Sequence, residues 1–105
     1  EARDAAKVHA ARRATEAPLA AAARMRAALA LAETLRPQVK KSVVSDVDAG
    51  KDQLRGAIHA AHRNVDINLP ALPEDERAAP AAERAALASE AETLARREGA
   101  QSRSR

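Results

Sequence analysis

Three side chains that bind metals in many proteins lie close together in the middle of the chain. His59, His62 and Asp66 are separated by three and four residues, so a helix would bring them to one flank, where imidazole and carboxylate groups can ligate a divalent cation. One helix offers too few ligands, and the remaining histidine, His9, lies far away in the sequence. We therefore predict no metal and no cofactor, and expect Arg55 and these three side chains to form a solvated flank.

Other patterns that can carry chemistry fail at defining positions. The segment Asp46–Asp52 has the acidic spacing of a calcium loop, but such a loop needs glycine at its sixth position and an acid at its twelfth, where this chain has Lys51 and Ala57. The same segment has Ser45 where a phosphate loop needs its first glycine. The chain has no Cys, and its serines lack the surroundings of a catalytic nucleophile. We predict that the protein is not an enzyme.

Basic side chains favour a second interpretation. The net charge is +3, which permits weak contact with nucleic acid but does not require it. The absence of aromatic residues argues against stacking on single-stranded bases. The predicted phosphate contacts are Arg12, Arg13, Arg24, Arg26, Lys40 and Lys41.

The composition predicts helices with little to bury. Ala accounts for 30 of the 105 residues, and only 18 larger aliphatic residues accompany it. Because Ala is the best helix former and loses no side-chain entropy, such a chain is strongly helical while its core stays thin. We expect a partner, or a second copy of the chain, to supply the missing burial.

The stretch Gln38–Asp66 contains the clearest helical pattern, with apolar or small residues at steps of three and four. These residues are Val43, Val47, Gly50, Leu54, Ala57, Ala61 and Val65. Gly50 costs about 1 kcal/mol relative to Ala in a helix, which predicts close approach of another backbone, with Ala22 and Ala28 facing it. The alternative is a break at Gly50, with Ser45 and Asp46 capping a second helix.

Residues 1–36 show a similar pattern, in which Met25 and Leu29 are the largest members. Pro18 divides this segment, and we favour a new helix capped by Thr15 over one long helix kinked at the proline. Because Pro37 disfavours helical angles in the residue before it, the first helix should end near there. The short link predicts an antiparallel hairpin; the alternative is a single bent rod.

The last third of the chain changes character. Three prolines between residues 67 and 80 predict a connector over residues 67–79, which Ile67, Leu69 and Leu72 fasten either to the hairpin or to a partner. A helix over residues 80–99 should end at Gly99, followed by a disordered tail over residues 100–105.

We therefore predict an all-α protein: an antiparallel helical hairpin over residues 1–66 and a shorter third helix, forming a bundle or coiled-coil-like assembly. The predicted function is a non-catalytic interaction or assembly module, and the alternative is a nucleic-acid-associated accessory protein. We expect a protein partner or homo-oligomer, no membrane span, and a soluble intracellular (cytoplasmic) location. A start at Glu1 rather than Met is typical of a processed form or fragment. The predicted interaction seam is Met25, Leu29, Val43, Val47, Gly50, Leu54, Ala57 and Ala61.

Overall fold

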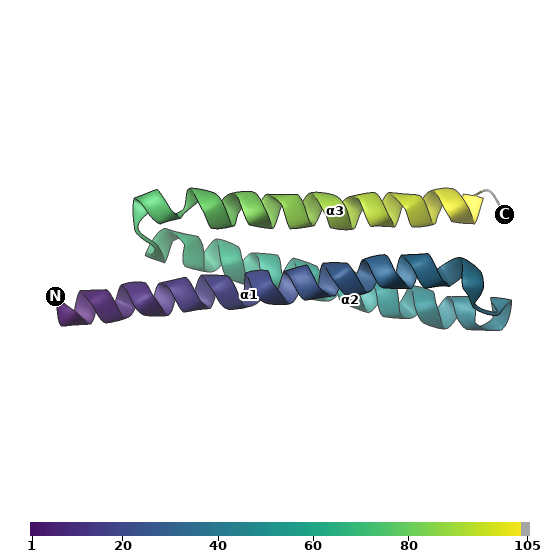
Figure 1. Ribbon diagram of the computed structural model, residues 1–105, viewed down its shortest axis with the longest axis horizontal. Coiled ribbons are helices and arrows are strands. Elements are labelled where there is room, and N and C mark those ends of the chain that lie inside the picture. Colours follow the sequence, from purple (N-terminus) through teal and green to yellow (C-terminus); the bar gives the residue numbers. More distant parts are fainter. Residues whose placement is uncertain (104–105) are drawn as a thin grey trace.

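The fold is an elongated bundle of three helices that run alternately up and down (Figure 1). The computed structural model describes the backbone of residues 1–103 and the side chains of residues 1–94. The helices are α1 (Ala2–Leu35), α2 (Val44–Asn68) and α3 (Ala78–Arg103), and the Cα atoms extend over 61 × 19 × 16 Å. The predicted all-α architecture of a hairpin plus a third helix is confirmed, and α3 is shorter than α1 but as long as α2.

The hairpin turn is short and begins at Arg36, next to the proline as predicted, although Arg36 itself keeps helical angles (φ −49°, ψ −48°). Two 3-10 turns, Arg36–Gln38 and Lys41–Val43, join α1 to α2. Between them the chain extends at Val39 and Lys40, and it reverses direction, which excludes the single bent rod.

The connector between α2 and α3 is shorter than predicted, since α2 reaches Asn68 and α3 begins at Ala78. It contains two further 3-10 turns, Leu69–Ala71 and Glu74–Glu76. Leu72 is buried, and Arg77 donates a hydrogen bond to its carbonyl at 3.0 Å. The connector is therefore fastened to the bundle at Leu72.

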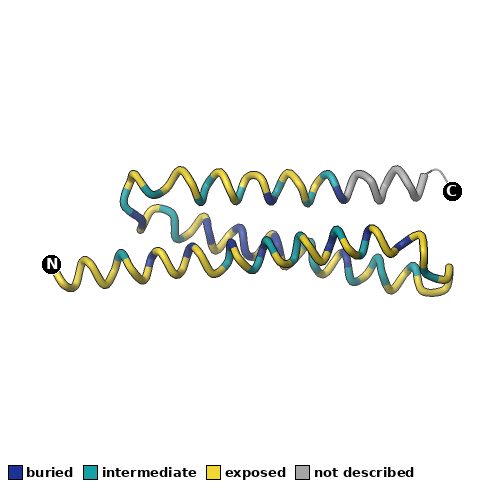
Figure 2. The backbone as a smooth tube through the Cα atoms, in the orientation of Figure 1, coloured by how far each residue is buried: buried dark blue, intermediate teal, exposed yellow. Residues whose placement is uncertain are grey.

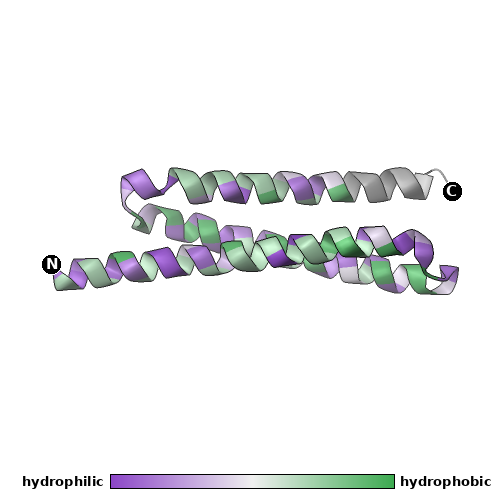
Figure 3. Ribbon diagram, viewed as in Figure 1, coloured by the Kyte–Doolittle hydropathy of each residue, from purple (hydrophilic) through white to green (hydrophobic). Residues whose placement is uncertain are grey.

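The core lies between the helices, and Figure 2 shows the buried positions at intervals along all three of them. Figure 3 shows hydrophobic and hydrophilic residues interspersed along α1 rather than one continuous apolar band. The core has two clusters around α1, one near the connector and one nearer the hairpin turn. Its buried apolar residues are Ala11, Leu19, Ala22, Leu29, Ile58, Ala61, Val65, Leu72, Leu87 and Leu94.

Pro18 lies inside a continuous helix, so the prediction of a new helix capped by Thr15 is wrong. The Thr15 hydroxyl instead donates to the Ala11 carbonyl at 2.9 Å. Proline has no N–H, which leaves the carbonyl four residues earlier, that of Ala14, without its helical donor. The side-chain amide of Asn68 on α2 donates to this carbonyl at 3.3 Å. A residue of the second helix thus compensates for the proline of the first.

The two glycine predictions also fail. α2 continues through Gly50, and a Cβ built there would meet nothing within 4 Å, so Gly50 neither breaks the helix nor approaches another segment of this chain. α3 continues past Gly99 to Arg103, because glycine ends a helix through a left-handed conformation, and no described glycine has a positive φ. Residues 100–103 of the predicted tail are therefore helical, and residues 104–105 lie outside the described residues.

The link between Asn68 and Pro18 predicts a non-additive pair of mutations. Asn68→Ala should lower the free energy of unfolding by about 0.5–1.5 kcal/mol, measured by urea denaturation followed by circular dichroism. In a Pro18→Ala background the new amide at position 18 bonds the Ala14 carbonyl, so the same change should cost less. The bond from Asn68 to the Asn64 carbonyl (2.7 Å) is lost in both backgrounds and cancels. Equal costs in the two backgrounds would contradict this account.

Candidate interaction site

The hairpin end of the bundle holds a buried ion pair between its two long helices. Lys51 on α2 donates to Glu33 on α1, and their side chains are 0% and 8% exposed. Charged residues are almost never buried without a partner, because desolvation of a lone charge costs several kcal/mol. Each side chain therefore requires the other, and the pair fixes how α1 and α2 are aligned.

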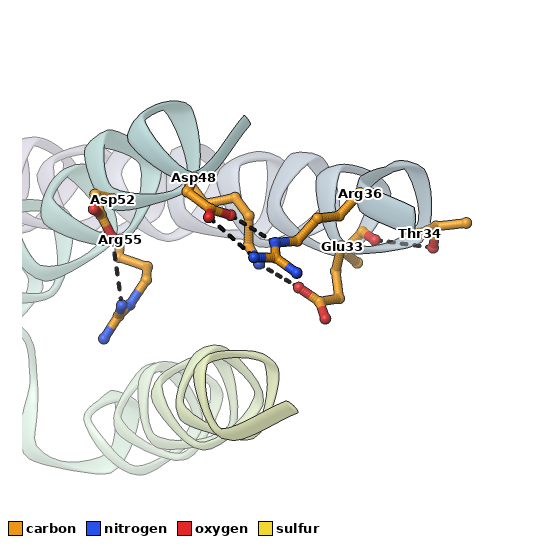
Figure 4. Close-up of polar contacts among 8 residues, drawn as sticks. Glu33, Thr34, Arg36, Asp48, Asp52 and Arg55 are labelled. Carbon is orange, nitrogen blue, oxygen red and sulfur yellow. Dashed lines mark hydrogen bonds and ion pairs between the residues drawn. The ribbon is translucent and has the colours of Figure 1, made fainter. Parts of the chain in front are cut away.

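A second ion pair lies beside the first. Arg36 donates two hydrogen bonds to the Asp48 carboxylate, at 2.7 and 3.1 Å, and Figure 4 shows the two side chains pointing toward one another, with Glu33 nearby. These bonds hold the pKa of Asp48 below its usual value, although partial burial acts in the opposite direction. Asp48 thus stabilises the fold above its ordinary pKa, and this contribution is lost as the pH falls through the lowered value.

An apolar groove of about 410 Å³ lies on the side of the same helix pair that carries Leu35 and Gly50, and Lys51 forms part of its lining. Successive residues of a helix are rotated by about 100° around its axis, so Leu35 and Gly50 point to a different side of their helices from Glu33 and Lys51. The groove is lined by Ala32, Leu35, Val39, Asp46, Val47, Gly50, Lys51 and Leu54. Two leucines beside it are well exposed, Leu31 at 59% and Leu35 at 44%.

The groove belongs to a longer face, which we call the open flank. Its members follow steps of four and three residues along both helices, and ten of the twelve are exposed. α3 covers the other side of the hairpin, where Glu90 lies 2.9 Å from Arg26 and Arg84 lies 2.9 Å from Asp66. The open flank comprises Ala17, Ala21, Arg24, Ala28, Leu31 and Leu35 of α1 and Asp46, Gly50, Gln53, Ala57, Ala60 and Asn64 of α2.

The predicted interaction seam is divided between the core and the surface. Met25, Leu29, Leu54 and Ala61 pack in the core clusters. Val47 and Gly50 line the groove, as Leu54 also does; Ala57 is exposed on the open flank, and Val43 is exposed at the turn. The spacing of three and four residues predicted α2 correctly, but it grouped residues of its core-facing side and of the open flank into one face.

Two of the predicted phosphate contacts are engaged within the bundle. Arg12 donates two hydrogen bonds to Glu76, at 2.6 and 2.7 Å, which raise the pKa of Arg12 and lower that of Glu76. Arg26 forms the ion pair with Glu90. The remaining four predicted contacts, Arg13, Arg24, Lys40 and Lys41, are exposed. The structure does not gather the six into one basic surface, and phosphate binding stays a prediction.

The histidine flank differs from the prediction of a solvated surface. His59 is exposed, but His62 is only 2% exposed, because it lies where α3 packs on α2. Asp66 accepts two hydrogen bonds from Arg84 of α3, at 3.1 and 2.9 Å. Within the described residues no group of three His, Cys, Asp or Glu side chains is placed to hold a metal ion. None of the described helices has the length and apolar character needed to cross a bilayer.

The fold and the site define a helical-bundle domain with one uncovered face. Residues 1–87 match the sequence model of formiminotransferase-cyclodeaminase, a range that includes α1, α2 and the first part of α3. Since this is most of the 105-residue chain, the protein belongs to the formiminotransferase-cyclodeaminase family. No curated protein and no solved structure matches the chain.

The buried ion pair gives the second prediction. Lys51→Met leaves the Glu33 carboxylate buried without its cation, so the free energy of unfolding should fall by about 3–5 kcal/mol in urea denaturation. Adding Glu33→Leu removes the stranded charge and should restore most of the loss. The matched control is Lys40→Met at an exposed position, which should change little. If the double variant is no more stable than Lys51→Met, burial of an unpaired charge is not the cause.

Proposed function

We propose that this chain is a non-catalytic assembly module that pairs with a second copy of itself through the open flank. The observation that carries the proposal is an apolar groove beside Gly50, on a face where exposed leucines adjoin small residues. A residue with no side chain permits another helix to approach closely. Covering this face would also supply the burial that a core with few large side chains lacks.

The size of the open flank suits a dimer. The α2 members of the open flank, from Asp46 to Asn64, cover 19 residues, which at 1.5 Å per residue is about 28 Å. Two packed helices present a width of about 19 Å, from an axis separation of 8–10 Å and a helix diameter of about 10 Å. The face therefore offers roughly 530 Å² per copy, or about 1,060 Å² over two copies, which just exceeds the 1,000 Å² or so that a specific protein interface buries.

The charges of the open flank are complementary under twofold symmetry. The pairs Glu33–Lys51 and Arg36–Asp48 both have residue numbers that sum to 84, so continuing this register places Asp46 level with Gln38, in the turn that follows α1 (84 − 46 = 38). Along the bundle axis, Arg24 thus lies seven residues before Leu31, and Asp46 is level with a point seven residues after Leu31. A twofold axis between the copies, perpendicular to the helices at Leu31, brings Arg24 of each copy level with Asp46 of the other, as an isologous interface requires.

The third prediction compares two glycines of α2. Gly50 lies on the open flank and Gly56 lies about 120° away around the helix, and a Cβ at either would meet nothing within 4 Å. Gly50→Leu should weaken association about tenfold or more by obstructing the partner helix, whereas Gly56→Leu should not. Both changes remove a helical glycine, so their effects on helix stability are matched.

Molar mass in solution is the readout, determined by light scattering after size exclusion with refractive-index detection, since the chain has no Trp or Tyr. We expect a dimer for the unmodified chain and for Gly56→Leu, and a shift toward monomer for Gly50→Leu. A monomeric unmodified chain, or a Gly50→Leu variant that dimerises as well as the control, would refute the proposal.

Membership in a family named after an enzyme favours a second candidate function, a direct part in cyclodeaminase catalysis. The described residues offer no paired acid and base or nucleophile to which a step could be assigned, so this candidate rests on the family alone. An assay for ammonia release from formimino-bearing substrates by the purified chain separates the two candidates.

A further inference from the structure

The interface between α2 and α3 buries a histidine that lacks a hydrogen-bond partner for one of its ring nitrogens. His62 is 2% exposed, and its Nε2 atom is buried without a hydrogen-bond partner among the described residues. The side chain borders a small cavity of about 80 Å³ lined by Arg55, Ile58, His59, His62, Ala88, Ala91 and Glu92. A neutral imidazole tolerates this position at a modest cost, whereas a charged one requires a compensating anion.

The charged groups around His62 do not provide that compensation. On α2, Arg55 and His59 border the cavity, and Asp66 is engaged by Arg84 of α3. Glu92 of α3 borders the cavity but is exposed, and α1 contributes no residue to the lining. Burial lowers the pKa of His62, Arg84 and His59 lower it further, and Asp66 acts in the opposite direction.

The element packed over His62 is held weakly. Only two described residues of α3 are buried apolar side chains, Leu87 and Leu94. Among the described side chains, α3 forms ion pairs to the hairpin through Arg84 with Asp66 and Glu90 with Arg26; these side chains are 33–53% exposed, and such surface pairs contribute little. A small loss of docking free energy is therefore enough to release α3 from the hairpin.

We propose that His62 makes the docking of α3 pH-sensitive, so that protonation of its imidazole in mildly acidic solution releases α3 from the hairpin. The released state exposes His62 to water, where its pKa returns to the ordinary value of about 6.5. The released state binds the proton more readily than the docked state, so docking is fully stable above about pH 6.5 and weakens as the pH falls below it. This regulation is independent of the open flank, which lies on the other side of the hairpin.

Hydrogen exchange of the whole chain tests the proposal, with the protection of residues 78–94 compared between pH 7.5 and pH 5.5 after correction for intrinsic exchange rates. The opening equilibrium of α3 should rise by up to about tenfold per pH unit below pH 6.5, while α1 changes less. In His62→Leu, and in the polar, non-titrating His62→Gln, the pH dependence should disappear.

His9→Gln is the matched control because His9 is exposed at the far end of α1, and this variant should behave like the unmodified chain. The proposal is overturned if α3 protection in the unmodified chain is the same at both pH values. It is also overturned if both His62 variants retain the pH dependence. Uniform loss of protection in α1, α2 and α3 would show global unfolding rather than release of α3, and would equally reject it.

Discussion

The arrangement of this bundle depends on the buried contact between Lys51 and Glu33. With few large apolar side chains available, packing alone specifies the alignment of two Ala-rich helices weakly, since neighbouring registers bury similar surfaces. An ion pair removed from water does not tolerate displacement, because a slip by one turn would leave both charges buried and alone. Arg36 with Asp48 reinforces this register at the hairpin end, and Asn68 with the Ala14 carbonyl fixes it near the connector.

A fixed hairpin has two faces, and α3 covers one of them. The other keeps its small residues, exposed leucines and groove, which is the property that the proposed assembly uses. α3 is likewise sparsely packed, since within its described residues 78–94 it docks over a buried histidine with two buried leucines. Polar contacts therefore specify the fold, and the weakly covered surfaces are where association and regulation are proposed.

The fold class and the hairpin turn next to Pro37 could be predicted from the sequence, because alanine content, periodicity and proline act locally; the end of α2 was predicted two residues early, at Asp66 rather than Asn68. The continuity of α1 could not, since the donor that compensates for Pro18 lies on another helix. Lys51 and Glu33 were missed as well, although Glu33 with Arg36 and Asp48 with Lys51 form complementary i, i+3 patterns that could have indicated facing helices. The burial of His62 depends on where α3 docks, which the connector does not reveal.

The most direct test of the proposed assembly places one cysteine on its symmetry axis, which is straightforward because the chain has no native Cys. In Leu31→Cys the two thiols should face each other, and a short bifunctional thiol reagent should link the copies into a covalent dimer. Ala20→Cys is the control, since its two thiols would lie about 33 Å apart. Efficient linking through position 31 and not position 20 is the predicted result. Equal linking at both positions, or none at position 31, would contradict pairing through the open flank.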